Sequence, residues 1–146
     1  MEMANEVDLE TKKKAVSIIQ YLGFEESGYW SLENNDIAFN LFKSQTETNI
    51  LYAFVVDDQV VYIGKSVQSL FKRMYLYKNF GPSQYTNIRN HASIKDCLEQ
   101  GKTVRIYALI QKVPMEYKGI PINLASGLED NLISLLKPNW NITGNH

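Results

Sequence analysis

Residues 50–64 of this 146-residue chain read ILYAFVVDDQVVYIG, and this stretch decides the fold. The two apolar runs, 50–56 and 60–64, are rich in β-branched and aromatic residues, which is typical of β-strands. The polar residues Asp57, Asp58 and Gln59 between them favour a tight turn. The stretch therefore predicts a β-hairpin.

A helix is expected to follow this hairpin. Gly64 ends the second strand, and the hydroxyl of Ser66 is a suitable N-cap for a helix. Apolar residues then recur at the i, i+3, i+4, i+7 spacing of a core-facing stripe: Val67, Leu70, Phe71 and Met74.

The rest of the chain after the hairpin predicts three further elements, separated by glycine and proline. Gly101 stops the first of them, and the last ends at Lys137 because the residue before Pro138 is disfavoured in helical geometry. These elements are a helix over 86–98, a strand over 103–110 and, after a loop containing Pro114 and Pro121, a helix over 124–136. Together with the hairpin they indicate an α+β fold, a small three-stranded antiparallel sheet flanked by helices.

The first 48 residues predict a separate N-terminal extension built from a helix and a hairpin. A helix is expected over 8–22, with Gly23 as its stop. Short strands are expected over 29–32 and 37–42, around the turn-forming residues 33–36. Residues 43–49 form a polar linker, so we expect an extension over 1–48 and a core domain over 49–146.

The length and composition of the chain limit its class. A chain of 146 residues forms one ordinary domain, with or without an extension. Its single cysteine, Cys97, cannot form an internal disulfide, which favours a reducing compartment. The N-terminal residues have no secretion signal, and no apolar run approaches the ~20 residues of a membrane span. A soluble, cytoplasmic protein without a membrane partner is expected.

The charge is unevenly distributed, although the net value is only −1. Residues 1–50 hold nine acidic side chains against four lysines, and residues 51–146 hold eleven basic side chains against seven acidic ones. The basic residues concentrate at Lys65, Lys72, Arg73, Lys78, Arg89, Lys95 and Lys102. Such a stripe forms either a phosphate-attracting face or ordinary solvated surface.

Five short motifs occur in order in the second part of the chain. Residues 50–52 read Ile-Leu-Tyr, residues 62–66 read Tyr-Ile-Gly-Lys-Ser, and Arg73 follows in the next helix. Glu129 lies in the last helix, and residues 137–141 read Lys-Pro-Asn-Trp-Asn. This combination resembles the GIY-YIG nuclease family over roughly residues 49–143. The resemblance implies a GIY-YIG-like core and an endonuclease that hydrolyses DNA phosphodiester bonds.

Two motif positions depart from the usual family pattern. The first motif keeps Tyr52 but lacks its usual glycine. Arg73 lies eleven residues after Tyr62, whereas many members place the arginine ten residues after, where Lys72 stands in this chain. We prefer Arg73, because Tyr77 follows it at i+4 on the same helical face.

Phosphodiester hydrolysis requires neutralised phosphate charge, an activated water and help for the departing oxygen. A guanidinium binds two phosphate oxygens through its planar fork, so Arg73 is the expected phosphate clamp. One carboxylate with phosphate oxygens and several waters is a common way to hold Mg²⁺. Glu129 is therefore the expected side-chain ligand of Mg²⁺ (or Mn²⁺).

The resemblance implies that Tyr52 or Tyr62 orients or deprotonates the attacking water. A tyrosine acts as a base only if its pKa falls from about 10 toward neutrality. Lys65 is expected near Tyr52 across the hairpin, which favours Tyr52 as the base. Tyr62 and Tyr77 are then expected to hydrogen-bond the phosphate or the water, and Asn141 is an active-site group or a local structural one.

The expected partner is DNA, contacted by Gly64, Ser66, Lys72, Lys78 and Arg89. The compact core looks most like the small restriction-type members of the family, which often cut as homodimers. The alternative is a nucleic-acid-binding module that uses the same basic face without catalysis. A P-loop is disfavoured, because Gln59 stands where that motif requires a glycine.

Overall fold

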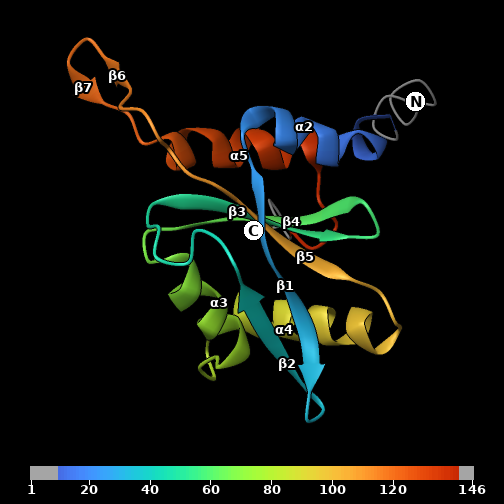
Figure 1. The fold of residues 1–146 in the computed structure, drawn as a ribbon. Helices are drawn as coiled ribbons and strands as arrows, with labels where there is room; N and C mark the ends of the chain where they lie inside the picture. Colours follow the sequence, from blue (N-terminus) through green and yellow to red (C-terminus); the bar gives the residue numbers. More distant parts are fainter. Residues whose placement is uncertain (1–9, 142–146) are drawn as a thin grey trace.

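A five-stranded antiparallel sheet with strand order β2-β1-β5-β3-β4 forms the centre of the fold. The computed structural model describes residues 10–141. Its strands are β1 (Glu25–Glu33), β2 (Asp36–Leu41), β3 (Ile50–Val56), β4 (Gln59–Ser66), β5 (Val104–Leu109), β6 (Glu116–Tyr117) and β7 (Ile120–Pro121). Its helices include α2 (Ala15–Leu22), α3 (Leu70–Lys78), α4 (Tyr85–Glu99) and α5 (Leu124–Leu136). Figure 1 shows α2 and α5 on one side of the sheet and α3 and α4 on the other.

Strand β3 is buried on both faces, which explains its unbroken apolar sequence. Ile50, Tyr52, Phe54 and Val56 belong to the core that includes α3 and α4. The intervening residues, Leu51, Ala53 and Val55, belong to the second core, formed with α2 and α5. Because side chains alternate along a strand, one apolar run supplies both layers.

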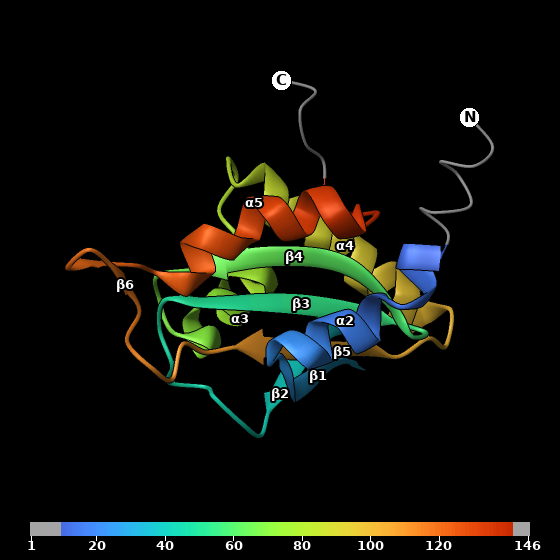
Figure 2. The ribbon, with the colours of Figure 1, turned by 90° about the horizontal axis from the view of Figure 1, so that it is seen from above.

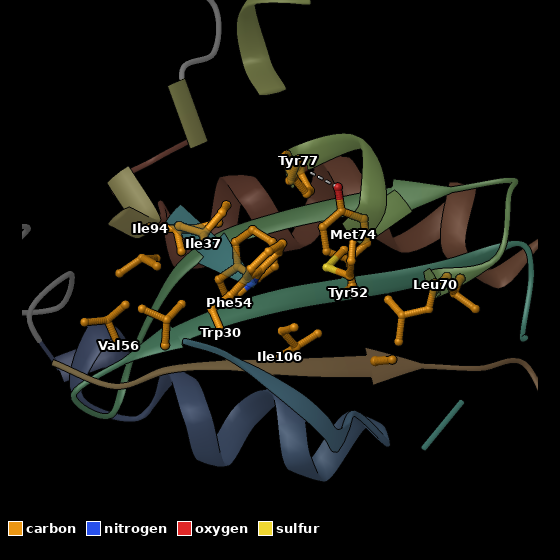
Figure 3. Close-up of a cluster of buried hydrophobic side chains, with 14 residues drawn as sticks. Trp30, Ile37, Tyr52, Phe54, Val56, Leu70, Met74, Tyr77, Ile94 and Ile106 are labelled. Atoms are coloured by element: carbon orange, nitrogen blue, oxygen red, sulfur yellow. Dashed lines mark hydrogen bonds between the residues drawn. The ribbon is translucent and has the colours of Figure 1, made fainter. Parts of the chain in front are cut away.

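Aromatic rings fill the core between the sheet and α3 (Figure 3). The ring centroids of Phe54 and Tyr77 are 5.5 Å apart, and those of Tyr52 and Tyr77 are 6.2 Å apart, both at edge-to-face angles. Such pairs contribute about 0.5–1.5 kcal/mol each beyond the apolar area that they bury. They hold α3 in a fixed orientation against β3.

The two hairpin turns have the geometry that right-handed strand twist requires. Asn34 and Asn35 join β1 to β2 with φ of 52° and 63°, and Asp57 and Asp58 join β3 to β4 with φ of 48° and 63°. Positive φ at both central residues is the signature of a type I′ turn, and short polar side chains tolerate it.

The α+β class is confirmed, but the prediction of three strands is wrong. Strand β1 pairs with β5 in addition to β2, so the hairpin of residues 25–41 extends the sheet of the core. The expected boundary at 48/49 falls between β2 and β3, and strands from both sides of it share one sheet. Residues 8 and 9 of the expected first helix lie outside the described residues, and residues 10–13 and α2 are helical.

The start of α3 also differs from its prediction. Ser69, rather than Ser66, caps the helix by accepting a hydrogen bond from the backbone N–H of Lys72 at 3.2 Å. Ser66 is instead the last residue of β4, and Val67 is 73 % exposed before the helix begins. The buried positions of α3 are Leu70, Met74 and Tyr77, whereas Phe71 is 50 % exposed.

The loop predicted around Pro114 and Pro121 contains a third hairpin, β6–β7, which forms a separate two-stranded sheet. This hairpin extends away from the body of the molecule (Figures 1 and 2). The bounds predicted for α5 are confirmed, and Ala125, Leu132 and Leu136 are its buried residues. Within residues 10–141, the helices are too short or too polar to cross a bilayer.

Candidate functional site

The guanidinium of Arg73 is held by three acceptors from three elements. Nε donates to the hydroxyl of Tyr52 in β3 at 3.1 Å, and Nη2 donates to the hydroxyl of Tyr77 at 3.0 Å. Nη2 also donates to Oδ1 of Asn87 in α4 at 2.9 Å. The two hydroxyls lie 2.5 Å apart and hydrogen-bond to each other, as the dashed line in Figure 3 shows. We call Arg73, Tyr52, Tyr77 and Asn87 the Arg73 cluster.

The Arg73 cluster keeps a positive charge that its own members do not neutralise. A guanidinium has five N–H donors, of which Nε and Nη2 supply the three that are used. Within residues 10–141, Nη1 has no hydrogen-bond partner and Arg73 forms no ion pair. Nη1 therefore offers two N–H groups to an anion.

The two phenols of the cluster are too deeply buried to ionise readily. Tyr52 is 1 % exposed and Tyr77 is fully buried. Burial raises the pKa of Tyr52, Tyr62 raises it further, and the opposing effect of Arg73 is smaller. Burial likewise raises the pKa of Tyr77 well above its ordinary value of 10.0. The lowered pKa expected of Tyr52 is therefore wrong, because desolvation outweighs the nearby positive charge.

These raised pKa values predict a loss of stability at alkaline pH. Above pH 10 the phenols of the unfolded chain release protons that Tyr52 and Tyr77 retain in the fold. The free energy of unfolding should therefore fall by about 1.4 kcal/mol per pH unit for each phenol above that pH. Urea unfolding at pH 9 to 11 measures this slope, and Tyr52→Phe should reduce it. An unchanged free energy of unfolding across this range would contradict the burial of both phenols.

Gly64 allows the Tyr52 hydroxyl to reach the edge strand β4. Tyr52 and Gly64 are cross-strand partners, and a Cβ on Gly64 would lie 2.6 Å from the Tyr52 hydroxyl oxygen. It would also lie 2.9 Å from Cε2 of Tyr62. Only glycine permits this close approach of the two tyrosine side chains to the backbone of β4.

Gly64→Ala is therefore expected to destabilise the fold, by about 1–3 kcal/mol as in other overpacked cores. Gly127→Ala is the matched control, because nothing lies within 4 Å of a Cβ at that position in α5. That control should stabilise the protein by roughly 0.5–1 kcal/mol, as alanine does in a helix interior. Thermal unfolding of both variants measures the difference. Equal stability of the two variants would rule out the close packing of Tyr52 on Gly64.

Strand β4 lies at the edge of the sheet, beside α5 (Figure 2), and Trp140 and Asn141 bind backbone groups of that edge. The backbone N–H of Ile63 donates to Oδ1 of Asn141 at 2.9 Å, and Nδ2 of Asn141 donates to the carbonyl of Ile63 at 2.8 Å. The N–H of Trp140 donates to the carbonyl of Val61 at 2.8 Å. The amide of Asn141 thus satisfies the two backbone groups of Ile63 that a neighbouring strand would otherwise bind, which is a structural role.

Glu129 meets the same edge two residues further along β4. Its carboxylate lies 3.8 Å from the Lys65 ammonium, and both the charge and the backbone N–H of Lys65 act to lower the pKa of this carboxyl group. The side chains of Lys65 and Glu129 are 45 % and 21 % exposed. Burial raises the pKa of Glu129, and Lys65 opposes this effect only in part.

Lys65 does not lie where the sequence predicts it. It pairs with Leu51, on the face of the sheet opposite to Tyr52, and its ammonium reaches Glu129. A bulge in β4 opposite Phe54 and Val55 shifts the register of the hairpin by one residue. A shift of one residue moves a side chain to the other face of a sheet.

The candidate site is centred on Gly64 and Lys65. The Tyr52 hydroxyl packs against Gly64 from the face covered by α3, and Glu129 of α5 forms an ion pair with Lys65 on the other face. A guanidinium cluster and a carboxylate therefore contact adjacent residues of one edge strand. Such a pair of groups can bind a phosphate on one side and a cation on the other.

The remaining predicted site residues lie around this centre. Tyr62 is partly buried, with its ring centroid 6.1 Å from that of Tyr52. The Ser66 hydroxyl donates to the carbonyl of Gln68 at 2.9 Å. Lys72 and Arg89 are exposed, and Lys78 is partly exposed. Hydrogen bonds connect none of these three basic side chains to the Arg73 cluster within residues 10–141.

Asn87 is a member of the cluster that the sequence did not indicate. It lies in the first turn of α4, is 6 % exposed, and belongs to no motif. Among residues 10–141, no three His, Cys, Asp or Glu side chains gather as a metal-binding group. A metal ion at this site would therefore depend on few protein ligands.

Comparison with known proteins identifies relatives of the fold. No family model matches the chain, and no curated protein matches it either. A mutant of bacteriophage T4 EndoII matches with a TM-score of 0.67 and 25 % identity, over 86 % of this chain and 97 % of that chain. The restriction endonuclease HPY188I in complex with product DNA has a TM-score of 0.49 and 20 % identity, over 75 % and 70 % of the two chains. The first match shows that this chain shares the fold of T4 EndoII.

Proposed function

We propose that this protein is a divalent-metal-dependent DNA endonuclease of the GIY-YIG type. One observation carries the proposal: the Tyr52 hydroxyl that binds the unneutralised Arg73 guanidinium, and the partly buried Glu129 carboxylate, lie against adjacent residues, Gly64 and Lys65, of the edge strand. The shared fold with the endonuclease T4 EndoII and the ordered motifs of the sequence support it. Residues 49–146 contain every candidate catalytic residue, so we propose them as the catalytic unit.

Arg73 is the proposed phosphate clamp. Its Nη1 is available, and its other donors are held by neutral acceptors, so the full positive charge faces the substrate. Charge-assisted hydrogen bonds to phosphate strengthen as negative charge accumulates in the transition state. Lys72, Lys78 and Arg89, together with the backbone near Gly64 and Ser66, are proposed to hold the DNA backbone alongside.

Glu129 is the proposed metal ligand, and its surroundings fit this task. The carboxylate is partly exposed, and within residues 10–141 its ion-pair partner is the Lys65 ammonium at 3.8 Å, so it retains lone pairs for a cation. Mg²⁺ commonly keeps several waters and takes one or two carboxylates with the phosphates of its substrate. When bound, Mg²⁺ or Mn²⁺ polarises the phosphate and lowers the pKa of a bound water.

Tyr62 is the phenol best suited to orient the attacking water. Unlike Tyr52 and Tyr77, it is partly exposed, and its hydroxyl has no hydrogen-bond partner within residues 10–141. Tyr52 and Tyr77 instead fix the guanidinium of Arg73. Lys65 places an ammonium beside Glu129, where it can interact with the same phosphate.

Incubation of supercoiled plasmid with the protein tests the function directly. Nicked or linear DNA is expected with Mg²⁺ or Mn²⁺, and intact DNA with a chelator. We further propose a restriction-type enzyme that acts in the cytoplasm as a homodimer. Sequencing the cut ends tests the restriction-type part, because it shows whether both strands are cut at a fixed sequence. DNA that is bound but never cut would favour the alternative, a nucleic-acid-binding module that uses the same basic face.

A further inference from the structure

We propose that Asn87 is a positioning residue that sets the orientation of the Arg73 guanidinium. The inference rests on the proposed function, since it assigns Asn87 to the same phosphate site. Asn87 lies in α4, whereas the other members of the cluster lie in β3 and α3. It is therefore the contact through which α4 acts on the site.

The amide of Asn87 has only one orientation that satisfies its neighbours. Its Nδ2 donates to Oε1 of Gln84 at 3.2 Å, and that oxygen also accepts from the backbone N–H of Gly81 at 2.7 Å. Because Oε1 is an acceptor, Nδ2 must point toward Gln84, and Oδ1 must point toward Arg73. The loop that precedes α4 thus fixes the acceptor presented to the guanidinium.

Asn87 completes the set of contacts that determines which edge of the guanidinium is free. Nη2 has two protons; one is donated to Tyr77 and the other to Asn87. With Nε bound to Tyr52, only Nη1 remains for a phosphate. Without Asn87, one Nη2 proton loses its acceptor, and the guanidinium can turn away from its catalytic orientation.

The acceptor must also be neutral for the phosphate site to keep its charge. An aspartate at position 87 would accept the same hydrogen bond, and a charge-assisted bond is roughly twice as strong as a neutral one. That carboxylate would, however, pair with Arg73 and cancel the charge intended for the phosphate. Aspartate cannot donate to Gln84, but a role limited to holding Arg73 would still tolerate it better than alanine, whereas a positioning role in phosphate binding would tolerate neither.

The test compares kcat and KM for plasmid cleavage, together with thermal unfolding, in wild-type protein, Asn87→Ala and Asn87→Asp. Both substitutions should lower kcat by about 10- to 100-fold, as small displacements of catalytic groups do, with little change in KM. The Tm of Asn87→Asp should exceed that of Asn87→Ala, because the carboxylate keeps the bond to Arg73 although it cannot donate to Gln84. Asn87→Ser, which keeps a neutral acceptor, should recover part of the lost kcat.

The matched control is Asn90→Ala, one turn further along α4. Asn90 is also buried, at 1 % exposure, and its Nδ2 has no partner within residues 10–141. This variant should cut DNA at the wild-type rate. Wild-type kcat in Asn87→Asp, or an equal loss in Asn90→Ala, would overturn the inference.

A second readout does not depend on cleavage. In ¹⁵N NMR spectra the Nη groups of Arg73 should give separate, slowly exchanging signals in wild-type protein, assigned by their absence in Arg73→Lys. Asn87→Ala should merge or broaden them, and unchanged signals would refute the positioning role. If wild-type protein cuts no DNA but Asn87→Ala loses these signals, the proposed function fails while the positioning of Arg73 stands.

Discussion

Replacing Glu129 by glutamine is expected to lower the rate of DNA cleavage by about 10³-fold. Glutamine keeps the size of the side chain and an oxygen that can face Lys65, but it removes the charge that attracts Mg²⁺. A bound metal ion stabilises the transition state by several kcal/mol, and about 4 kcal/mol corresponds to this factor. Single-turnover cleavage with saturating enzyme measures the effect.

The control for this experiment is the neighbouring carboxylate. Asp130 lies beside Glu129 in α5 and is exposed. Asp130→Asn removes the same charge from the same helix, and its cleavage rate should stay within a few-fold of wild type. A Glu129→Gln enzyme with the wild-type rate would remove Glu129 as the metal ligand, and equal losses in both variants would indicate a general electrostatic effect.

Replacing Arg73 by lysine should lower kcat by about 10²- to 10³-fold, the range for loss of one preorganised donor to transition-state charge. Lysine retains a positive charge but has no planar fork. It cannot bind Tyr52, Tyr77 and Asn87 together and still present an N–H to the phosphate. Pre-steady-state kinetics on a plasmid or oligonucleotide substrate measures kcat.

Lys72 provides the comparison within α3. Its side chain is exposed and has no part in the Arg73 cluster, so Lys72→Ala should raise KM and weaken the salt dependence of binding while kcat stays nearly unchanged. The two variants together decide whether Arg73 or Lys72 is the catalytic basic residue of the motif. A larger loss of kcat in Lys72→Ala than in Arg73→Lys would reverse the assignment.

Local sequence patterns predicted those parts of the fold whose determinants are local. The hairpin of β3 and β4 and the bounds of α5 follow from apolar runs, turn residues and Pro138. The pairing of β1 with β5 did not, because it joins strands far apart in the chain and no local pattern encodes the partner. The five-stranded sheet was therefore missed.

The site was predictable in its residue types but not in its geometry. The motifs indicated Tyr52, Arg73, Tyr77 and Glu129, and the i+4 spacing correctly placed Arg73 and Tyr77 together. A regular hairpin would have put Lys65 on the face of Tyr52, and the bulge in β4 reversed this. The pKa of Tyr52 depends on the burial of its side chain under α3, and this packing cannot be predicted from the sequence of β3 alone.

The contact between Asn141 and Ile63 has a consequence for the edge of the sheet. An edge strand with free N–H and C=O groups is a template on which another polypeptide can add and start an aggregate. Here a single amide occupies both groups of Ile63, next to the part of β4 that carries Gly64 and Lys65. Loss of the Asn141 amide would therefore expose a self-association surface beside Gly64 and Lys65. If an Asn141 variant is inactive, light scattering must first exclude aggregation before the loss is attributed to the chemistry of the site.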